Sequence, residues 1–321
     1  MGESQSSIDI VNQIENYIRS SVFRKANQAG GVGLSPNTIR MYRSLSSIWS
    51  DYLMISSRSS ILLKDLDRKA IEGFSFWLLY EKKYALNYVG QLLKMTKTII
   101  RDAQKSGYEI HPYTSYIEGF TEASANRRVI TLTNEEIKRI EGLSNLSMSL
   151  ENHRRWMLLG LHVGQRVSDL LSLKPYQIRE AGNGLYLDFF QKKTRKAITV
   201  GVKNPLIVDW LSNFDFKPIS DQAFNRGLKM VAQKAGIDTM TEGYQMDRST
   251  RRRSLGLYPK YQLISSHSLR RTFATLHYGK VPTPLIMEIT GHSKETTFLS
   301  YIGKTRNKDH IADTFLRYLN F

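Results

Sequence analysis

The chain has 321 residues, 41% of them hydrophobic and 11% aromatic, so it can bury one large core or two ordinary ones, and we expect two domains. Its 46 Lys and Arg against 29 Asp and Glu give a net charge of +17, which favours a polyanion such as nucleic acid over a small acidic substrate. It contains no cysteine, which excludes disulfides, thiolate zinc sites and a cysteine nucleophile and is typical of a reducing compartment.

The N-terminus shows no targeting signal, because its polar start, MGESQSSIDI, lacks a charged region followed by an apolar core. The apolar clusters at Phe74–Tyr80 and Trp156–Val163 are far shorter than a membrane span. We therefore expect a protein that does not enter a membrane and that works in the cytoplasm, associated with the nucleoid.

Helical periodicity dominates the first third of the chain. A leading helix is predicted within residues 8–28, and the glycines at 30, 31 and 33 break its pattern. Ser35 suits the N-cap of a second helix and Pro36 its first turn. A third helix follows residues 65–67, and a fourth covers about residues 85–104. These elements predict a small helical bundle.

Two of the predicted helices carry basic residues at three- and four-residue steps, so each would present a basic stripe to a phosphate backbone. Residues 1–128 hold seventeen basic and twelve acidic residues, so an ordinary solvated surface is an equal alternative. The candidate DNA contacts on these helices are Arg40, Arg43, Lys94, Lys97 and Arg101.

A change of composition marks a domain boundary near Arg128. The preceding stretch loses helical periodicity and contains Ser, Asn and Gly, which indicates a linker. The residues after it hold twenty-nine basic and seventeen acidic side chains, and therefore most of the net positive charge. We expect a leading helix and flexible segment at 1–33, a helical domain at 34–112, a linker at 113–128, and a second domain with a tail helix at 129–321.

The second domain is predicted to contain several helices and one hairpin. Residues 133–136 resemble a capping box at a helix start. Residues 184–202 alternate apolar and polar on either side of a basic centre, which predicts a hairpin with Lys192–Lys196 near its tip. Further helices are expected at about 151–163, 205–213 and 220–235. A basic, irregular run follows, in which Arg251 and Arg252 are candidate DNA contacts, although a solvated loop is the alternative.

The stretch His267–Tyr301 carries residues suited to chemistry on a phosphodiester. His267 and Arg270 lie three apart on one helix face and can converge on one phosphate. Cleavage without a metal needs a nucleophile, cations on the non-bridging oxygens and an acid for the leaving oxygen. Arginine suits the second role because its planar fork holds two phosphate oxygens. A tyrosine, with a free pKa of roughly 10, needs nearby cations or a base to attack.

These motifs, in this order, resemble those of the tyrosine recombinases, the phage integrase family of DNA breaking-and-joining enzymes. That family has an Arg box, a hairpin Lys, His-x-x-Arg, Gly-His and a Tyr nine residues after that His. The matching segments here are Gly164–Asp169, Lys193-Thr194, His267–Arg270, Gly291-His292 and Tyr301. The resemblance implies a mainly α protein with a small β-hairpin or sheet, in which a helical, SAM-like core-binding domain precedes a catalytic domain.

The resemblance also implies a role for each matching residue. Tyr301 would attack the scissile phosphate to form a 3′-phosphotyrosyl bond, and Lys193 would protonate the leaving 5′ oxygen. Lys192 is the alternative acid, and we favour Lys193 because the following Thr is shared with the family. Asp169 would be a supporting acid, whereas Arg271, where many relatives have His, falls outside the catalytic set. The candidate catalytic residues are Arg166, Lys193, His267, Arg270, His292 and Tyr301.

Each of these residues alone is more simply explained as an ordinary surface or packed side chain. Tyr301, for example, is one of seventeen tyrosines. What favours the functional interpretation is that five boxes occur in one order, at the intervals of one family, on a basic chain without cysteine. A topoisomerase-like enzyme that relaxes supercoils and a non-catalytic DNA-binding regulator are the two alternatives.

The resemblance implies a site-specific recombinase that integrates, inverts or resolves DNA. Its partner would be double-stranded DNA with inverted-repeat core sites, and it would need no metal ion, ATP or other cofactor. The tail at 305–321 has Ile311, Phe315 and Leu319 at four-residue steps. We expect this tail to dock on a neighbouring protomer of a tetramer on DNA, with packing against its own domain as the alternative.

Overall fold

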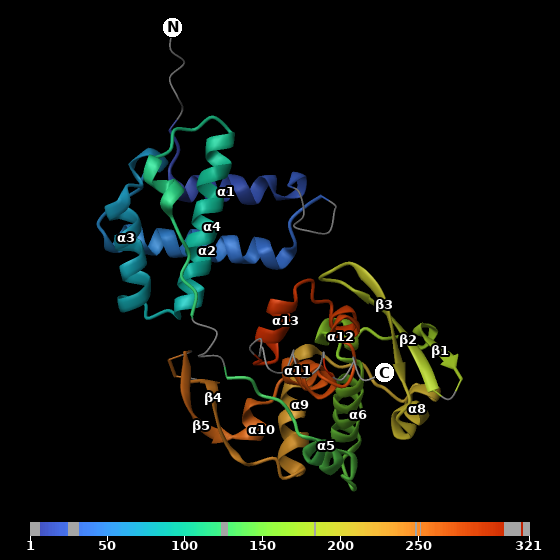
Figure 1. The fold of residues 1–321 in the computed structure, drawn as a ribbon. Coiled ribbons are helices and arrows are strands. Elements are labelled where there is room, and N and C mark those ends of the chain that lie inside the picture. The colour runs from blue at the N-terminus through green and yellow to red at the C-terminus, as the bar shows by residue number, and fades with distance from the viewer. Residues whose placement is uncertain are drawn as a thin grey trace. The chain divides into compact units, whose positions relative to one another are not determined.

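The computed structural model describes residues 7–24, 32–122, 128–182, 184–247, 249–250, 252–304 and Leu316. The chain forms two compact units, Met1–Asn126 and Arg127–Phe321, and each has its own hydrophobic core (Figure 1). Both units are mainly helical, and the strands of the described residues all belong to the second unit. None of the described helices is long and apolar enough to cross a membrane.

The first unit is a bundle whose helices begin at side-chain caps. Asp9, Ser35 and Asp67 each accept a hydrogen bond from a backbone N–H in the first turn of the following helix. The cap at Ser35 confirms the prediction made from the Ser-Pro pair. A π-helical turn, Trp77–Glu81, extends the third helix. The helices are α1 (Ile10–Arg19), α2 (Pro36–Ile55), α3 (Arg68–Phe76) and α4 (Leu86–Lys105).

Aromatic rings and a few satisfied polar pairs build the core of the first unit. Trp49 of α2 stacks on Phe74 of α3 with ring centroids 3.8 Å apart. The indole N–H of Trp49 donates to the buried Thr96 hydroxyl of α4 at 3.1 Å. Ile10 and Ile14 of α1 are fully buried in the same core. The leading helix therefore packs with α2 and α4 rather than standing apart from them.

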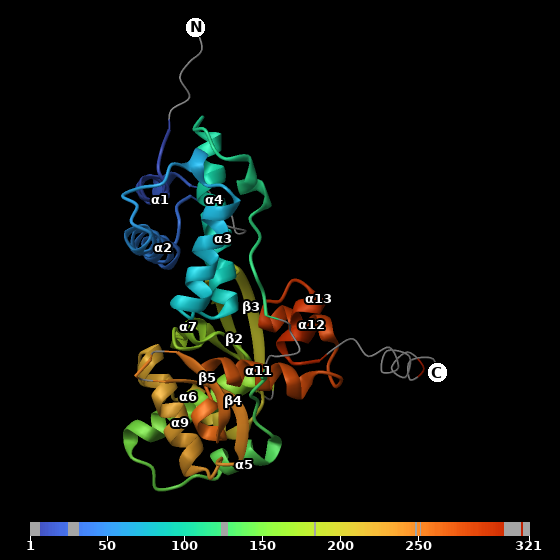
Figure 2. The ribbon, with the colours of Figure 1, turned by 90° about the vertical axis from the view of Figure 1, so that its left-hand side faces the viewer.

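The second unit surrounds the buried helix α6. This helix (Met148–Val163) packs against α9 (Asp221–Lys234) and α11 (Ser266–His277), as the two views of the fold show (Figures 1 and 2). The capping box predicted at Thr133 and Glu136 begins α5. The remaining helices of this unit are α5 (Asn134–Glu141), α7 (Val167–Leu170), α8 (Pro205–Ser212), α10 (Lys260–Leu263), α12 (Thr283–Thr290) and α13 (Glu295–Tyr301).

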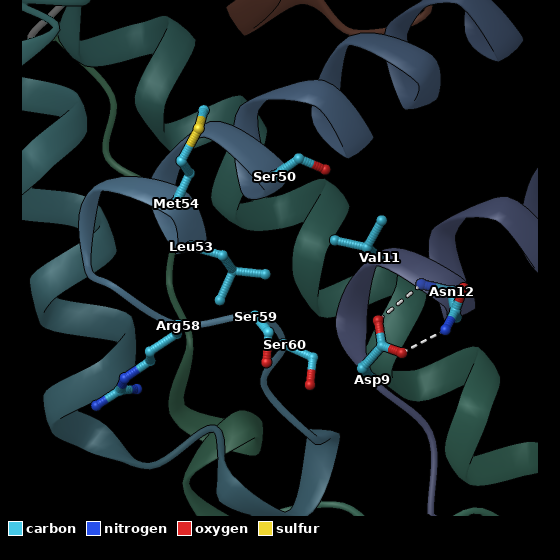
Figure 3. Close-up of a pocket in the computed structure, with 9 residues that line it drawn as sticks. All are labelled: Asp9, Val11, Asn12, Ser50, Leu53, Met54, Arg58, Ser59 and Ser60. Atoms are coloured by element: carbon cyan, nitrogen blue, oxygen red, sulfur yellow. Dashed lines mark hydrogen bonds between the residues drawn. The ribbon is translucent and has the colours of Figure 1, made fainter.

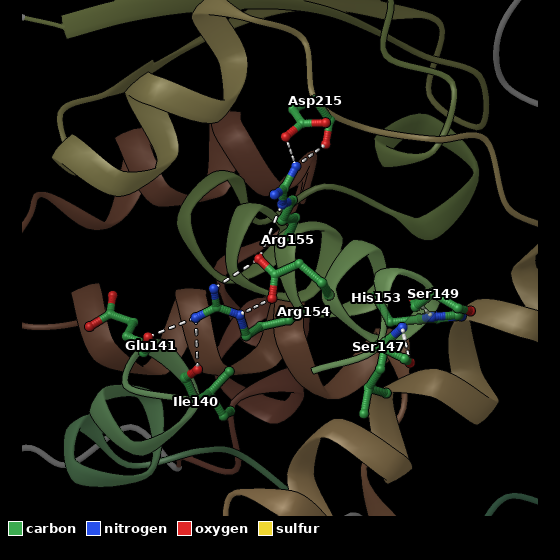
Figure 4. A network of polar contacts seen from close by, with 10 residues as sticks. Ile140, Glu141, Ser147, Ser149, His153, Arg154, Arg155 and Asp215 are labelled. Carbon is green, nitrogen blue, oxygen red and sulfur yellow. Dashed lines mark hydrogen bonds and ion pairs between the residues drawn. The ribbon is translucent and has the colours of Figure 1, made fainter. Parts of the chain in front are cut away.

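The buried Arg154 and the half-buried Arg155 connect α6 to its neighbours. Arg154, only 8% exposed, donates to both carboxylate oxygens of Glu151 and to the carbonyls of Ile140 and Glu141 at the end of α5 (Figure 4). Arg155 donates to Glu151 and to the backbone carbonyl of Asp215. Burial opposes ionisation of Glu151, but the bonds from both arginines hold its pKa below the ordinary value. Every charge in this network is paired.

An antiparallel sheet in the order β1-β2-β3 confirms the predicted hairpin. Its strands are β1 (Ile178–Ala181), β2 (Gly184–Gln191) and β3 (Lys196–Val202). The register of β2 and β3 pairs Gln191 with Lys196, which leaves residues 192–195 as the turn. Buried Leu187 and Phe189 alternate with exposed residues along β2. The basic tip thus lies at the end of the hairpin, beyond the last paired residues of β2 and β3.

A second sheet lies where the sequence predicted irregular structure, and that prediction was wrong. β4 (Met240–Met246) pairs with β5 (Arg253–Pro259). The strands keep large apolar residues on an open face, where Met240 is 58% and Leu257 is 64% exposed, and two glycines face each other at the centre. The pattern of a half-buried strand is therefore missing from the sequence.

Candidate active site

The six candidate catalytic residues lie on five separate segments of the second unit. Arg166 precedes α7, and Lys193 lies in the turn between β2 and β3. His267 and Arg270 belong to α11. The last two, His292 after α12 and Tyr301 at the end of α13, follow later in the chain.

The structure brings Tyr301 between the two candidate histidines. Its ring centroid lies 5.0 Å from that of His267 and 4.8 Å from that of His292. The charges of Arg166 and Arg270 add to the effect of burial in lowering the pKa of both histidines, and they oppose the rise that burial causes in the pKa of Tyr301. We call the five residues Arg166, His267, Arg270, His292 and Tyr301 the tyrosine cluster.

Two glycines make the turns that lead into this cluster. Gly164 ends α6 and Gly291 ends α12, and both have a positive φ, at 60° and 61°. A Cβ on Gly164 would lie 2.4 Å from the ring of Phe273, and one on Gly291 would lie 2.3 Å from Oε1 of Gln191. Only glycine fits both turns, which explains the fixed approach of the chain to Arg166 and His292.

The two arginines of the cluster are held with spare hydrogen-bonding capacity. Arg270 is only 3% exposed and donates to the carbonyl of Gly164 at 2.7 Å. Burial, with the charge of Arg166, lowers the pKa of Arg270 to about 10, so it stays charged at neutral pH. Nη1 of Arg166 and Oδ2 of Asp169 are buried without a hydrogen-bond partner among the described residues. Buried polar atoms without a partner are uncommon in native proteins, and a catalytic role is one of their recognised causes.

Both histidines are neutral near pH 7 because burial and nearby cations disfavour their charged forms. The pKa of each is lowered to about 4, by desolvation first and then by arginine charges, and solvent weakens the effect of those charges more at His267, whose side chain is exposed, than at the half-buried His292. The Thr290 hydroxyl donates to the carbonyl of Ile286 at 2.6 Å, so its oxygen accepts the Nδ1–H of His292 at 2.8 Å. This leaves Nε2 of His292 as the nitrogen able to accept a proton.

Tyr301 is protonated in this arrangement. Burial raises the pKa of its hydroxyl, while the charges of Arg270, Arg271 and Arg166 oppose that rise. Its hydroxyl oxygen is buried and lies near the guanidinium of Arg270, but it makes no hydrogen bond of good geometry with any described residue. A negatively charged group that drew the arginines onto the phenol oxygen would favour its ionisation.

The hairpin places its lysines differently. Lys193 is exposed at the tip, and its charge contributes to the lowered pKa of His267. Lys192 is anchored, since its backbone N–H donates to Oδ1 of Asp169 at 3.2 Å and its ammonium lies 3.5 Å from the carbonyl of Ser168. Both side chains are exposed, so the preference for Lys193 over Lys192 stays a prediction from the sequence.

The predicted DNA contacts of the first unit are mostly exposed. Arg40 and Arg43 lie on α2, and Lys94 and Arg101 on α4, all open to solvent. Lys97 is half-buried, and its ammonium donates to the carbonyls of Ser115 and Ile117 at 2.7 and 2.8 Å, so it also anchors the segment after α4. In the second unit Arg252 is half-buried, whereas Arg251 and the tail at 305–321, apart from Leu316, lie outside the described residues.

Three residues contact this region that the sequence did not place in the site: Arg271, which was set outside the catalytic residues, and Gln165 and Gln191, which were given no role. The guanidinium of Arg271 lies 5.2 Å from the ring centroid of Tyr301. Gln165 and Gln191 are buried beside the segments of Arg166 and Lys193. Only the position of Gln165 next to Arg166 gave a hint in the sequence, because the contacts of Arg271 and Gln191 depend on how distant segments pack.

A pocket of about 510 Å³ lies in the first unit, where Asp9, Asn12, Arg58 and Ser60 are among the nine residues around it (Figure 3). None of those nine is a candidate catalytic residue. Within the described part of the chain, no group of three or more His, Asp or Glu side chains is arranged to hold a metal ion.

Profiles of known protein families match both units of the chain. The profile of the phage integrase family matches residues 131–308, and that of the phage integrase SAM-like domain matches residues 11–117. A search of curated proteins gives no significant match.

Solved structures share the fold at low sequence identity. A lambda integrase dimer bound to a COC′ core site has a TM-score of 0.67 and 17% identity, over 94% of this chain and 99% of that one. A lambda integrase tetramer bound to a Holliday junction has a TM-score of 0.61 and 15% identity, over 90% and 79%. XerH site-specific recombinase bound to difH has a TM-score of 0.65 and 14% identity, over 98% and 99%. The chain therefore belongs to the phage integrase family and is a tyrosine-type site-specific recombinase.

Proposed function

We propose that Tyr301 cleaves one strand of a specific DNA site and that the tyrosine cluster, with Lys193, carries the reaction. The observation that carries this proposal is the set of buried polar atoms without partners, the Tyr301 hydroxyl and Nη1 of Arg166, beside the charged Arg270. A phosphodiester has the charge and the acceptor oxygens that these groups lack.

The proposed reaction is a pair of transesterifications. The phenol oxygen of Tyr301 attacks the scissile phosphorus, the bond to the 5′ oxygen breaks, and a 3′-phosphotyrosyl link forms. Arg166 and Arg270 stabilise charge on the non-bridging oxygens. The phenolic proton passes to a neutral histidine, for which Nε2 of His292 is the acceptor with the better-defined tautomer. Lys193 gives a proton to the departing 5′ oxygen.

The second step reverses the first on a new strand. The 5′ hydroxyl of the partner strand attacks the phosphotyrosyl link, and the proton movements run in the opposite direction. Because the link conserves the energy of the phosphodiester, the scheme consumes no ATP and uses no metal ion. The reaction can therefore exchange strands with no net change in the number of phosphodiester bonds.

The proposed partner is double-stranded DNA with inverted-repeat core sites, bound by four copies of the chain. The exposed arginines and lysines of α2 and α4, with Arg251 and Arg252 of the second unit, would contact its phosphates. The tail at 305–321 would join neighbouring copies through Ile311, Phe315 and Leu319. The DNA of a mobile element or chromosome is the expected substrate, so a cytoplasmic, nucleoid-associated location is part of the proposal.

A covalent capture experiment tests this function. The protein is incubated with nicked duplexes of randomised sequence, in which the short 5′-hydroxyl fragment diffuses away after cleavage and prevents reversal. Adducts that survive denaturation are isolated and their DNA is sequenced. We expect one enriched sequence with inverted repeats, and no adduct from Tyr301→Phe. Adducts without sequence preference, with relaxation of any plasmid, would instead favour a topoisomerase, and the absence of any adduct would contradict the mechanism.

A further inference from the structure

Two buried glutamines join three segments that carry the proposed site. Gln165, which is 2% exposed, comes directly before Arg166. Gln191, which is fully buried, ends β2 and comes two residues before Lys193. Both reach the backbone of Ile289, three residues before His292. The pair therefore links the arginine, hairpin and histidine segments through direct hydrogen bonds.

All four side-chain amide hydrogens of Gln165 and Gln191 donate hydrogen bonds. Nε2 of Gln191 donates to Oε1 of Gln165 at 3.0 Å and to the carbonyl of Ile289 at 2.9 Å. Nε2 of Gln165 donates to the same carbonyl at 3.0 Å and to that of Val163 at 2.9 Å. A fully satisfied network of this kind holds its members in one geometry, whereas removing one member leaves buried polar atoms without partners.

Gln191 also holds the hairpin turn itself. Its Oε1 accepts the hydroxyl of Thr194 at 2.7 Å, and its backbone carbonyl accepts the N–H of Arg195 at 2.7 Å. Gly291 approaches the same side chain so closely that any Cβ there would collide with Oε1. The turn that contains Lys193 is thus attached at its base to a single buried amide.

The sheet itself does not require a polar side chain at position 191. The other inward-facing residues of β2, Leu187 and Phe189 among them, are apolar, and apolar side chains fill such positions without the cost of burying an amide. The amide pair is therefore best explained by the segments that it joins.

We propose that Gln191, supported by Gln165, is a positioning residue that holds the hairpin so that Lys193 reaches the leaving 5′ oxygen while Arg166 holds the phosphate and His292 accepts the proton of Tyr301. This inference rests on the proposed function. Gln191 acts through Lys193 and touches no DNA. Its loss therefore affects the proton transfer to the leaving group and spares the attack by Tyr301.

A sulfur substitution at the leaving atom separates these two steps. In a duplex with a 5′-bridging phosphorothiolate at the cleavage position, the leaving group is a thiolate, which departs without a proton from an acid. The experiment uses the duplex selected by covalent capture, in oxygen and sulfur forms, and measures single-turnover adduct formation. Gln191→Met keeps the length of the side chain and removes its hydrogen bonds.

We expect Gln191→Met to slow cleavage of the oxygen substrate roughly a hundredfold, the effect of misplacing a catalytic group by about 1 Å. On the sulfur substrate its rate should stay within about threefold of the wild-type rate, which also shows that the variant is folded. Gln165→Met should show the same pattern, and Thr194→Val a weaker form of it. Gln245→Met is the matched control, because Gln245 forms an amide pair with Gln262 at 2.6 Å elsewhere in the same unit and should change neither rate.

Equal losses on both substrates, or no loss on either, would overturn the positioning role. If Gln191→Met proves insoluble, the comparison passes to Thr194→Val, whose rescue by sulfur is then decisive. The failure of the proposed function looks different. In that case the wild-type protein forms no adduct with either duplex, or Lys193→Ala is not rescued by sulfur.

Discussion

The two units differ in whether all the buried polar side-chain atoms described in them have hydrogen-bond partners. In the first unit, the indole of Trp49 has Thr96 as its partner and the side chain of Gln13 has Asp102. Among the described residues, buried side-chain atoms without a hydrogen-bond partner all belong to the second unit, and they include the Tyr301 hydroxyl and Nη1 of Arg166. Because such atoms cost stability, their concentration beside one tyrosine indicates a site built for a ligand.

Two arginines of the second unit, Arg154 and Arg166, show the same difference. Arg154 is buried in a network where carboxylates and carbonyls satisfy it, whereas Arg166 keeps a buried nitrogen without a partner. The first arginine holds helices together, and the second is available for a phosphate. Substitutions at the two positions should therefore separate stability from catalysis.

The largest expected effect is on cleavage by Arg166→Leu. Loss of one cationic donor to the transition state should slow adduct formation by about a thousandfold. The stability of the free protein should be unchanged or higher, because a buried nitrogen without a partner is removed. Single-turnover kinetics and thermal unfolding measure the two effects.

Arg154→Leu is the matched control for this prediction. It leaves the half-buried Glu151 with only one arginine and removes the donor to the carbonyls of Ile140 and Glu141, so it should cost about 1–3 kcal/mol of unfolding free energy. The cleavage rate of the molecules that remain folded should stay near the wild-type value. A large loss of stability in Arg166→Leu, with an unaltered rate in its folded fraction, would reverse the assignment.

In the first unit, Thr96→Val should affect stability alone. The change keeps the shape of the side chain and leaves the buried indole N–H of Trp49 without an acceptor, at a cost of about 1–3 kcal/mol. Chemical denaturation measures the loss. A defect in adduct formation at saturating DNA, with normal stability, would mean that this pair belongs to the catalytic machinery.

The neutral histidines predict a pH dependence of stability. Their folded pKa values, about 4, lie below the unfolded value of roughly 6.5, so the unfolded chain binds protons first. Stability is therefore lost as the pH falls from roughly 6.5 towards 4. At pH 5.5 we expect about 1 kcal/mol from the half-buried His292 and less from the exposed His267, because solvent screens its charge more strongly. The thermal unfolding midpoint of His267→Asn/His292→Asn should vary less over this range than that of the wild type, and parallel curves would contradict the prediction.

The smallest effect expected is that of Arg271→Gln. Its guanidinium lies near the ring of Tyr301, and its charge helps to lower the pKa of the phenol. Removal of this charge should slow cleavage by about tenfold or less, as expected for a partly buried cation–π contact. It should also shift the dependence of the cleavage rate on pH to higher pH. A rate that falls equally at every pH would assign Arg271 a structural role instead.

Local signals explain what could be predicted from the sequence. The cap at Ser35, the capping box at Thr133 and the hairpin after Gly184 each depend on residues a few positions apart, and all three form as expected. The family motifs named the cluster before its geometry was known, because their order and spacing are distinctive.

Packing between distant segments explains what could not be predicted. Gln191 forms hydrogen bonds with Gln165, which is 26 positions away in the sequence, and with the carbonyl of Ile289, which is 98 positions away. No rule of sequence spacing predicts either contact. Arg271 reaches Tyr301 only because α13 folds back beside α11. The β4–β5 sheet was missed because its apolar residues face outward.

The most direct test of the central claim is to identify the residue that is joined to DNA. The adduct from the capture experiment is digested with protease and nuclease, and the linked peptide is sequenced by mass spectrometry. The account predicts a nucleotide on Tyr301, bound through its 3′ phosphate. A nucleotide on any other residue, or a link through a 5′ phosphate, would contradict it.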